Sequence, residues 1–300
     1  MNRLMKTMLL AALLALPAVA LGAEDRSFKH LQSIYTDDKE AGLRAPEGVA
    51  CNDKSDLVVA DSGNGRLLRY KLQGRNMVGG TEIKIPQLNY PTRLQLTSKG
   101  EILALDLKLF KVARLTAEGA FAGYLEPKGV PAPEKYVLRS FKVDAADNVY
   151  LLDVANARVL VVDPAGKYLR QLPFPKEYGF ISDLGVANSG DIFLVDSVNP
   201  AVYLAQKGSE EFKPLTKNLK EYVDFPTYIA PDNRGGLFIV DEHGMAVAVL
   251  GIDGSFIARR LVMGWKDGQL NYPAQLCMAG NTVFLADRNN NKVQVFELVK

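Results

Sequence analysis

The stretch VVADSGNGRLLRY, from Val58 to Tyr70, decides how the chain folds. An apolar run ends at Asp61, a loop of small residues follows, and a second apolar run begins after Arg66. Taken alone, this pattern fits three interpretations: a catalytic carboxylate at a strand end, a phosphate-binding glycine loop, or a tight turn between two strands. Repetition of the motif along the chain distinguishes them.

The motif occurs six times. Its Asp recurs with spacings of 45, 47, 43, 45 and 46 residues, at Asp61, Asp106, Asp153, Asp196, Asp241 and Asp287. A second anchor lies 14 or 15 residues before each Asp, at Pro46, Pro91, Leu138, Ile181, Pro226 and Pro273. Each unit contains short apolar runs separated by polar turns, and we find no convincing amphipathic helix. Four strands in a unit of about 45 residues are typical of one blade of a β-propeller.

The two ends of the chain predict how the ring closes. The sixth unit stops at Lys300, 13 residues after Asp287, which leaves room for three strands. A spare strand-like piece, Phe28 to Tyr35, precedes the first unit. We therefore predict an all-β fold, a single six-bladed β-propeller of four-stranded blades over residues 24–300. In this fold the N-terminal strand completes the last blade and removes an exposed sheet edge.

The repeat resembles a known family. The sequence VVADSGNGR after a Pro-x-Gly-Val opening looks like an NHL repeat, and so do DVANAR from Asp153 and DRNNNK from Asp287. The resemblance covers essentially the whole chain after the first 23 residues and is best in units one, three and six. It implies a six-bladed propeller. It does not fix a function, because similar propellers serve as protein-binding scaffolds and related ones are lyases, lactonases and hydrolases.

Residues 1–23 have the pattern of a Sec-type signal peptide. Arg3 and Lys6 precede an apolar run from Met8 to Leu21, and small residues allow cleavage before Leu21 or before Glu24. An uncleaved membrane anchor is the alternative interpretation of this segment. We expect an exported protein, periplasmic or secreted, with no membrane span once the signal is removed.

The charge balance narrows the range of partners. The full chain has 36 basic and 34 acidic residues, and two of the basic ones lie in the predicted signal peptide. The mature chain is therefore close to neutral. A nucleic-acid partner is not expected, because such a surface needs a basic excess.

The repeated Asp is expected to be structural. An active site seldom needs the same carboxylate six times around a ring, whereas a short polar side chain at a strand end can bond backbone N–H groups and hold a turn. Gly63-Asn64-Gly65 lacks the following helix that phosphate-binding loops use, so we interpret it as a turn.

No cofactor is expected from the motifs. The two histidines, His30 and His243, lie far apart and form no HExxH pair, and no C-x-x-C-H sequence for haem attachment exists. A Ca²⁺ site built from Asp183, Asn188 and Glu242 is the remaining alternative, although no EF-hand-like spacing accompanies it.

The two cysteines lie in the first strands of units one and six, which ring closure makes neighbours. Counted from the proline anchors, Cys51 and Cys277 fall at +5 and +4, which turns their side chains toward each other. Counted from the Asp, both fall at −10 and point the same way. We prefer the proline count, because the shortened turn at 279–281 absorbs the missing residue. A disulfide, which export permits, and two buried thiols both remain open.

Departures from the six-fold pattern mark candidate binding residues. The loops before each anchor and after each Asp gather on one rim of the channel, where aromatic and Arg residues favour recognition. The candidate residues on this rim are Arg93, Lys108, Phe110, Arg139, Asp183, Tyr228, Glu242, His243, Gln275 and Arg288. Each of them can also be interpreted as an ordinary loop or packing residue. The same interpretation is strongest for Tyr90 and Tyr272, each of which directly precedes an anchor proline.

From these observations we predict an exported scaffold rather than an enzyme. It would bind a protein or peptide, of the cell envelope or secreted, through the rim. The alternative is a propeller lyase or hydrolase with its active site at the channel mouth, which requires Arg93, Arg139, Asp183, Glu242 and His243 to converge. A third interpretation, a small-molecule carrier or sensor, predicts a deep and partly apolar pocket.

Overall fold

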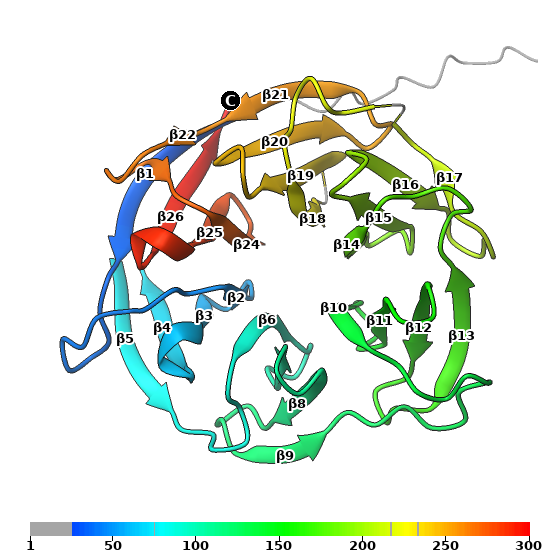
Figure 1. Ribbon diagram of the computed structural model, residues 1–300. Helices are drawn as coiled ribbons and strands as arrows, with labels where there is room; N and C mark the ends of the chain where they lie inside the picture. Colours follow the sequence, from blue (N-terminus) through cyan, green and yellow to red (C-terminus); the bar gives the residue numbers. More distant parts are fainter. Residues whose placement is uncertain (1–25, 75, 217, 233) are drawn as a thin grey trace, which may run out of the picture.

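Six four-stranded sheets stand around a central axis (Figure 1). The computed structural model describes residues 26–300 except 75, 217 and 233, so the predicted signal peptide, residues 1–23, lies outside the described residues. Within each sheet the strands are antiparallel, and the first strand of each unit lies nearest the axis. The predicted all-β, six-bladed propeller is confirmed.

The first three blades follow the chain in order from the axis outward. Blade 1 comprises β2 (Gly48–Cys51), β3 (Asp56–Asp61), β4 (Arg66–Gln73) and β5 (Asn76–Ile83). Blade 2 comprises β6 (Pro91–Leu96), β7 (Ile102–Asp106), β8 (Lys111–Leu115) and β9 (Phe121–Tyr124). Blade 3 comprises β10 (Leu138–Val143), β11 (Val149–Asp153), β12 (Arg158–Val162) and β13 (Tyr168–Pro173).

The next two blades repeat this order, and the outermost strand of the last blade comes from the N-terminal part of the chain. Blade 4 comprises β14 (Ile181–Val186), β15 (Ile192–Asp196), β16 (Ala201–Ala205) and β17 (Lys213–Pro214). Blade 5 comprises β18 (Pro226–Pro231), β19 (Gly236–Asp241), β20 (Ala246–Gly251) and β21 (Phe256–Arg260). Blade 6 comprises β24 (Pro273–Ala279), β25 (Thr282–Asp287), β26 (Lys292–Val299) and β1 (Ser27–Ile34). A short parallel pair, β22 (Val262–Met263) and β23 (Gln269–Leu270), connects blades 5 and 6.

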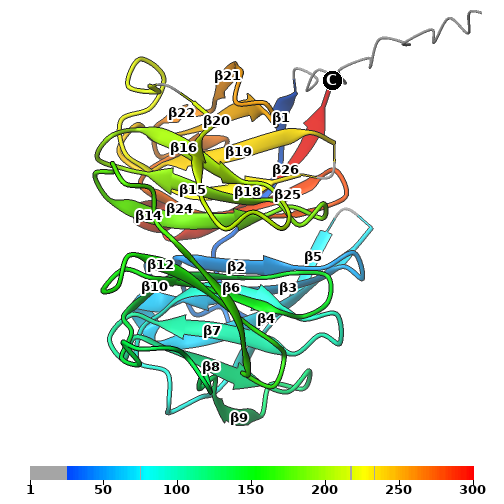
Figure 2. The same cartoon turned by 90° about the vertical axis from the view of Figure 1, so that its right-hand side faces the viewer.

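The N-terminal strand closes the ring as predicted. β1 pairs antiparallel with β26, from Ser27 opposite Val299 to Ile34 opposite Val293. Figures 1 and 2 both show this strand beside the C-terminal strand. The contact supplies the hydrogen-bonding partner that the last strand of the chain would otherwise lack.

The hydrophobic core lies between blades rather than at the axis. In the described part of the chain, six buried clusters each join one pair of neighbouring sheets, as Leu152 of blade 3 and Leu184 of blade 4 do in one of them. Each sheet therefore buries both faces, which explains why the second strands of the units are continuous apolar runs. The axis is left to the side chains of the innermost strands.

The repeated Asp holds the turn at the end of the second strand, as predicted. Asp61 is fully buried and accepts hydrogen bonds from the backbone N–H of Arg44 at 2.7 Å, from Asn64 at 2.8 Å and from Arg66 at 2.8 Å. The Gly-Asn-Gly segment is part of a 3-10 turn, η1 (Ser62–Asn64), closed by Gly65 at φ 63°. This positive φ suits glycine, so the segment is a turn and not a phosphate loop.

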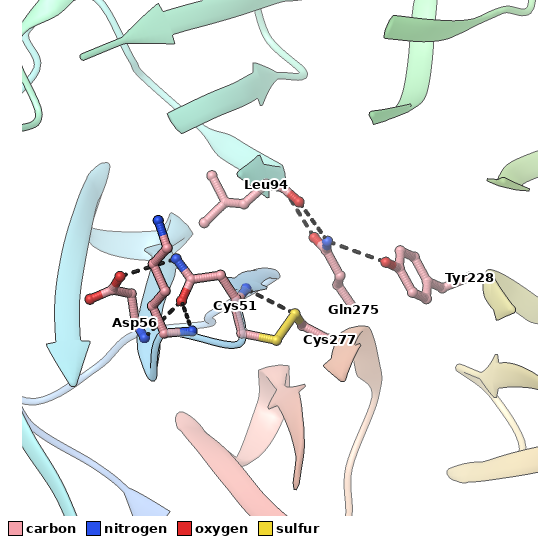
Figure 3. Close-up of a disulfide and its surroundings, with 8 residues drawn as sticks. Cys51, Asp56, Leu94, Tyr228, Gln275 and Cys277 are labelled. Carbon is pink, nitrogen blue, oxygen red and sulfur yellow. Dashed lines mark hydrogen bonds between the residues drawn. A yellow bond between two sulfur atoms is a disulfide. The ribbon is translucent and has the colours of Figure 1, made fainter. Parts of the chain in front are cut away.

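A disulfide joins the innermost strands of blades 1 and 6. Cys51 and Cys277 have Cα atoms 5.9 Å apart and a bond between their sulfur atoms (Figure 3). This is the pairing that the count from the proline anchors predicts. The disulfide thus fixes the two blades between which the ring closes.

Candidate active site in the central channel

Five innermost strands carry an irregularity near their first residue. The pairing with the second strand shifts between Pro91 and Arg93, and the same shift recurs after the anchors of blades 3, 4, 5 and 6. A bulge of this kind re-aims the side chains that follow it and is common beside active sites. Five of the ten candidate residues lie at these shifts: Arg93, Arg139, Asp183, Tyr228 and Gln275.

Arg93 lies inside the channel rather than on its rim. Its guanidinium donates to the carbonyl oxygens of Thr92 at 3.2 Å and of Thr227, on blade 5, at 3.5 Å. It also lies 5.7 Å from the centroid of the Tyr228 ring. The Nε–H of Arg93 is buried and has no acceptor among the described residues.

Gln275 and Tyr228 fill the middle of the channel. The Gln275 amide bonds the backbone N–H and C=O of Leu94 at 3.2 and 2.9 Å and lies 3.4 Å from the Tyr228 hydroxyl (Figure 3). Both side chains are almost completely buried.

A buried ion pair lies beside Tyr228. Lys142 Nζ is 3.1 Å from a carboxylate oxygen of Asp183 and 3.5 Å from the centroid of the Tyr228 ring. The Asp183 carboxylate also accepts from the Ser140 hydroxyl and, at 2.9 Å, from the backbone N–H of Ile229.

These positions correct one part of the sequence-based prediction. Arg93, Asp183, Tyr228 and Gln275 are buried in the channel and do not form an exposed rim. The reason is geometric, because six innermost strands converge and long side chains at their starts meet across the axis. Their polar atoms satisfy backbone groups on the strand edges that face the channel.

Arg139 lies at the mouth above this layer. Its guanidinium carbon is 6.0 Å from the centroid of the Phe180 ring, and its Nε–H is buried with no acceptor in the part of the chain that the structure describes. Burial and the neighbouring charge of Arg93 lower the pKa of Arg139, whereas Glu242, Glu47 and Asp183 act in the opposite direction. Two guanidinium groups and three carboxylates therefore interact at this end of the channel.

The two mouth carboxylates, Glu47 and Glu242, are linked through Arg288. Arg288 lies 2.9 Å from an oxygen of Glu242 and 3.9 Å from an oxygen of Glu47. The Tyr90 hydroxyl donates to Glu47 at 2.5 Å. Burial, and then this hydrogen bond to a carboxylate, raise the pKa of Tyr90 to about 12, so the phenol stays protonated at neutral pH.

The remaining predicted residues lie at the periphery. His243 is exposed, stacks on Phe225 at 4.5 Å between ring centroids, and meets the edge of Tyr272 at 5.8 Å. Lys108 Nζ lies 5.4 Å from the centroid of the Tyr90 ring, and Phe110 is an exposed loop residue. None of these contacts reaches Arg139 or the two mouth carboxylates.

Only part of the convergence that the enzyme alternative requires is seen. Arg93 and Glu242 lie close enough to Arg139 for their charges to act on its guanidinium, whereas Asp183 pairs with Lys142 in the layer below and His243 lies at the periphery. Glu47 and Arg288 complete the set of titratable residues at the mouth. Glu47 could have been found, because it is the one acidic residue directly after an anchor in any of the six units.

Lys142 is a second residue that the sequence analysis missed. The equivalent positions, four residues after each anchor, hold Ala50, Gln95, Gly185, Ala230 and Cys277. A charged residue in this otherwise uncharged set is the signal that would have identified it.

The three residues of the alternative Ca²⁺ site are not brought together. Asp183 is committed to Lys142, Ser140 and Ile229, and Glu242 pairs with Arg288. Asn188 lines a cavity at the other end of the channel. Over residues 26–300, apart from the three undescribed positions, no group of three or more His, Cys, Asp or Glu side chains is arranged to hold a metal ion.

Comparison with known proteins supports the fold. No protein-family model and no curated protein sequence matches the chain. Among solved structures, virginiamycin B lyase from Staphylococcus aureus, a catalytically inactive variant crystallised with quinupristin, matches with a TM-score of 0.66 and 16% identity, covering 91% of this chain and 100% of that one. A gluconolactonase from Xanthomonas campestris matches with a TM-score of 0.66 and 13% identity, covering 94% and 93%. A luciferin-regenerating enzyme matches with a TM-score of 0.63 and 12% identity, covering 90% and 96%.

The class that these findings define is the six-bladed β-propeller. At such low identity, the likeness shows the fold alone. The expectation of a protein- or peptide-binding scaffold is wrong as the main interpretation, because the similar propellers with named activities are enzymes and favour the alternative.

None of the described helices is long and apolar enough to cross a membrane.

Proposed function

We propose that the protein is an enzyme of the lyase or hydrolase kind, with its active site at the mouth of the channel around Arg139. The observation that carries the proposal is the pair of buried Nε–H groups of Arg93 and Arg139, which have no acceptor among the described residues, close to the carboxylates that Arg288 holds. Like charges repel each other strongly when they are buried. Two neighbouring guanidinium groups whose Nε–H groups have no acceptor among the described residues therefore favour an anion between them. A substrate oxygen that carries or develops negative charge meets this need.

The residues at the mouth suggest a division of roles. Arg93 and Arg139 would hold the substrate oxygen, since donors aimed at a developing negative charge supply much of the catalytic effect in acyl transfer and elimination. Glu242 or Glu47 would act as general base, taking a proton from water in a hydrolase or from carbon in a lyase. Arg288 would hold both carboxylates in place.

The test is turnover of a panel of lactones and streptogramin B compounds, followed by mass spectrometry. These compounds are chosen because the named relatives are a gluconolactonase and a streptogramin-type lyase. A hydrolase adds one water to the substrate, whereas a ring-opening lyase leaves the mass unchanged and creates a double bond. The product therefore distinguishes the two reactions.

Variants then locate the site. Removal of a general base costs 10²- to 10⁴-fold in rate, so Glu242→Gln or Glu47→Gln should lower kcat by about that factor. Arg139→Met should lower kcat/KM. The matched control is Glu211→Gln, at a carboxylate exposed on the outer part of blade 4. Full activity in Glu242→Gln, Glu47→Gln and Arg139→Met would contradict an active site at this mouth.

We also propose that the six units are NHL repeats and that the chain is exported through its N-terminal 23 residues. The support is the sequence motif and the signal-like segment described above. Expression of the full chain in a bacterial host, with N-terminal sequencing of the periplasmic fraction, tests the second point. A mature protein that begins at Leu21 or Glu24 is expected, and retention of Met1 in the cytoplasm would contradict export.

A further inference from the structure

Two Asn-Tyr-Pro tripeptides lie beside the mouth, at residues 89–91 before blade 2 and 271–273 before blade 6. The Tyr90 hydroxyl donates to Oε1 of Glu47, at the start of blade 1, at 2.5 Å. The Tyr272 hydroxyl bonds none of the described residues. The two tyrosines share a sequence motif, but only Tyr90 of the pair bonds a carboxylate.

The fold fixes the backbone on both sides of this bond. The N–H of Tyr90 donates to Asp106, the repeated Asp of blade 2, at 3.0 Å. The N–H of Glu47 donates to the carbonyl oxygen of Ala60 and to the hydroxyl of Ser62, each at 3.2 Å. Two side chains on backbone that is already ordered lose little further conformational entropy when they bond each other. The pair is therefore held in one geometry before any substrate arrives.

The two mouth carboxylates differ in how directly Arg288 holds them. Arg288 donates to Glu242 at 2.9 Å but lies 3.9 Å from Glu47, which is beyond hydrogen-bond length. A proton on Glu242 would weaken a charge-assisted hydrogen bond, whereas a proton on Glu47 would weaken a longer charge contact and a bond from a neutral phenol. Glu47 therefore loses less than Glu242 when it accepts a proton.

Tyr90 also decides which oxygen of Glu47 can take that proton. The phenol and Arg288 both contact Oε1, whereas Oε2 bonds none of the described residues. Burial and the bond to Glu47 raise the pKa of Tyr90 to about 12, so the phenol remains a donor at neutral pH. A protonated carboxyl still accepts through its carbonyl oxygen, so the bond from Tyr90 survives proton transfer to Oε2.

We propose that Glu47 is the general base of the mouth and that Tyr90 is its positioning residue. The inference rests on the proposed function, because it names which of the two carboxylates acts there. In a hydrolase, Oε2 takes a proton from water as the water oxygen bonds the carbonyl carbon. In a lyase, Oε2 takes a proton from carbon, the C–H electron pair forms the double bond, and the leaving oxygen keeps the electrons of the broken C–O bond.

Tyrosine titration tests the pair without a substrate. In the mature protein labelled with ¹³Cζ tyrosine, the Tyr90 signal is identified by its absence in Tyr90→Phe. Glu47→Gln removes the negative charge beside the phenol, so it should raise the ionised fraction of Tyr90 at about pH 11 by about threefold or more. Glu242→Gln is the control and should change this fraction far less. An unchanged titration of Tyr90 in Glu47→Gln would overturn the inference.

Kinetic coupling tests the role of the pair in the reaction. With a compound that the protein turns over, Glu47→Gln should lower kcat by about 10²- to 10⁴-fold, and at least about tenfold more than Glu242→Gln does. Tyr90→Phe should lower kcat about tenfold with little change in KM, and should have no further effect once Glu47→Gln is present. Tyr272→Phe is the matched control, since it removes a hydroxyl that bonds none of the described residues, and should change kcat by less than about twofold.

The outcomes separate this inference from the proposed function. Independent, multiplicative effects of Tyr90→Phe and Glu47→Gln, or a larger loss in Glu242→Gln than in Glu47→Gln, would overturn the inference while leaving an active site at the mouth. If no compound of the panel is turned over, the proposed function fails, and the base role of Glu47 fails with it, whichever way Tyr90 titrates.

Discussion

The side-chain amide of Gln275, on blade 6, bonds both the N–H and the C=O of Leu94, on blade 2. The innermost strand of a blade has no neighbour on its channel side, so its backbone groups need other partners. Gln275 provides one donor and one acceptor and so imitates a neighbouring strand (Figure 3). Arg93 and Asp183 act similarly toward Thr227 and Ile229.

Gln275→Leu should therefore destabilise the propeller. The change keeps the volume but leaves buried backbone groups unpaired, which costs about 1–3 kcal/mol for each group. Urea unfolding measures the loss. Gln95→Leu is the matched control, since its amide bonds none of the described residues, and it should change the free energy of unfolding by less than about 0.5 kcal/mol. Equal effects of the two changes would contradict this role for Gln275.

The disulfide should contribute to stability because it joins the blades where the ring closes. Cys51 and Cys277 are 226 residues apart, and a cross-link over a long loop typically stabilises by about 2–4 kcal/mol. The double change Cys51→Ala and Cys277→Ala should lower the urea midpoint by a corresponding amount. Mass spectrometry of the unreduced protein should find no free thiol, and two free thiols would rule the bond out.

Removal of a repeated Asp side chain should lower the free energy of unfolding most where that carboxylate pairs with a buried arginine. Asp153 accepts from Arg158 at 2.9 Å, and both side chains are buried. Asp153→Ala leaves this buried guanidinium without its carboxylate partner, although its hydrogen bonds to Gln171, Pro131 and Pro133 remain, and should cost about 3–5 kcal/mol. Adding Arg158→Met should recover part of the loss in the same unfolding assay. No recovery would mean that the backbone bonds of Asp153, and not the ion pair, carry its effect.

His243 should be dispensable for activity on any substrate that the mouth turns over. It stacks between Phe225 and Tyr272 and makes no described contact with Arg139 or the two mouth carboxylates. Loss of a general acid or base costs 10²- to 10⁴-fold, so we expect His243→Ala to lower kcat by less than about tenfold. A larger loss, with the melting temperature unchanged, would move the acid–base role to this histidine.

Acid should weaken the closing blade through Asp267. Burial would raise the pKa of Asp267, but hydrogen bonds from Tyr35, Ser33 and Lys292 outweigh it and hold the pKa well below its usual value. A lowered folded-state pKa stabilises the protein above the unfolded value of about 4, and this gain is lost as the pH falls below it. Since Asp267 is half-exposed, the effect is small. Unfolding between pH 5 and pH 2 should depend less on pH in Asp267→Asn, and an identical pH profile would contradict the assignment.

Sequence periodicity determined the architecture. Six Asp and anchor pairs in nearly constant register specify four-stranded blades, and the strand that the last unit lacks is supplied by the spare N-terminal strand. These features depend on apolar runs and turns, and each such pattern lies within a short continuous segment of the sequence. The structural role of the Asp follows from the same repetition.

The site depended on distances across the axis, which no local pattern contains. The sequence marked Arg93, Tyr228 and Gln275 as exceptions but placed them on an exposed rim. Their burial follows from the convergence of six strands, which brings side chains of opposite blades into contact. The pairing of Lys142 with Asp183, 41 residues further along the chain, and the meeting of Glu47, Glu242 and Arg288 around Arg139 likewise exist only in the closed ring. The sequence alone therefore determined which residues depart from the repeat, and the tertiary structure decided which of them meet, because ring closure sets the contacts across the channel.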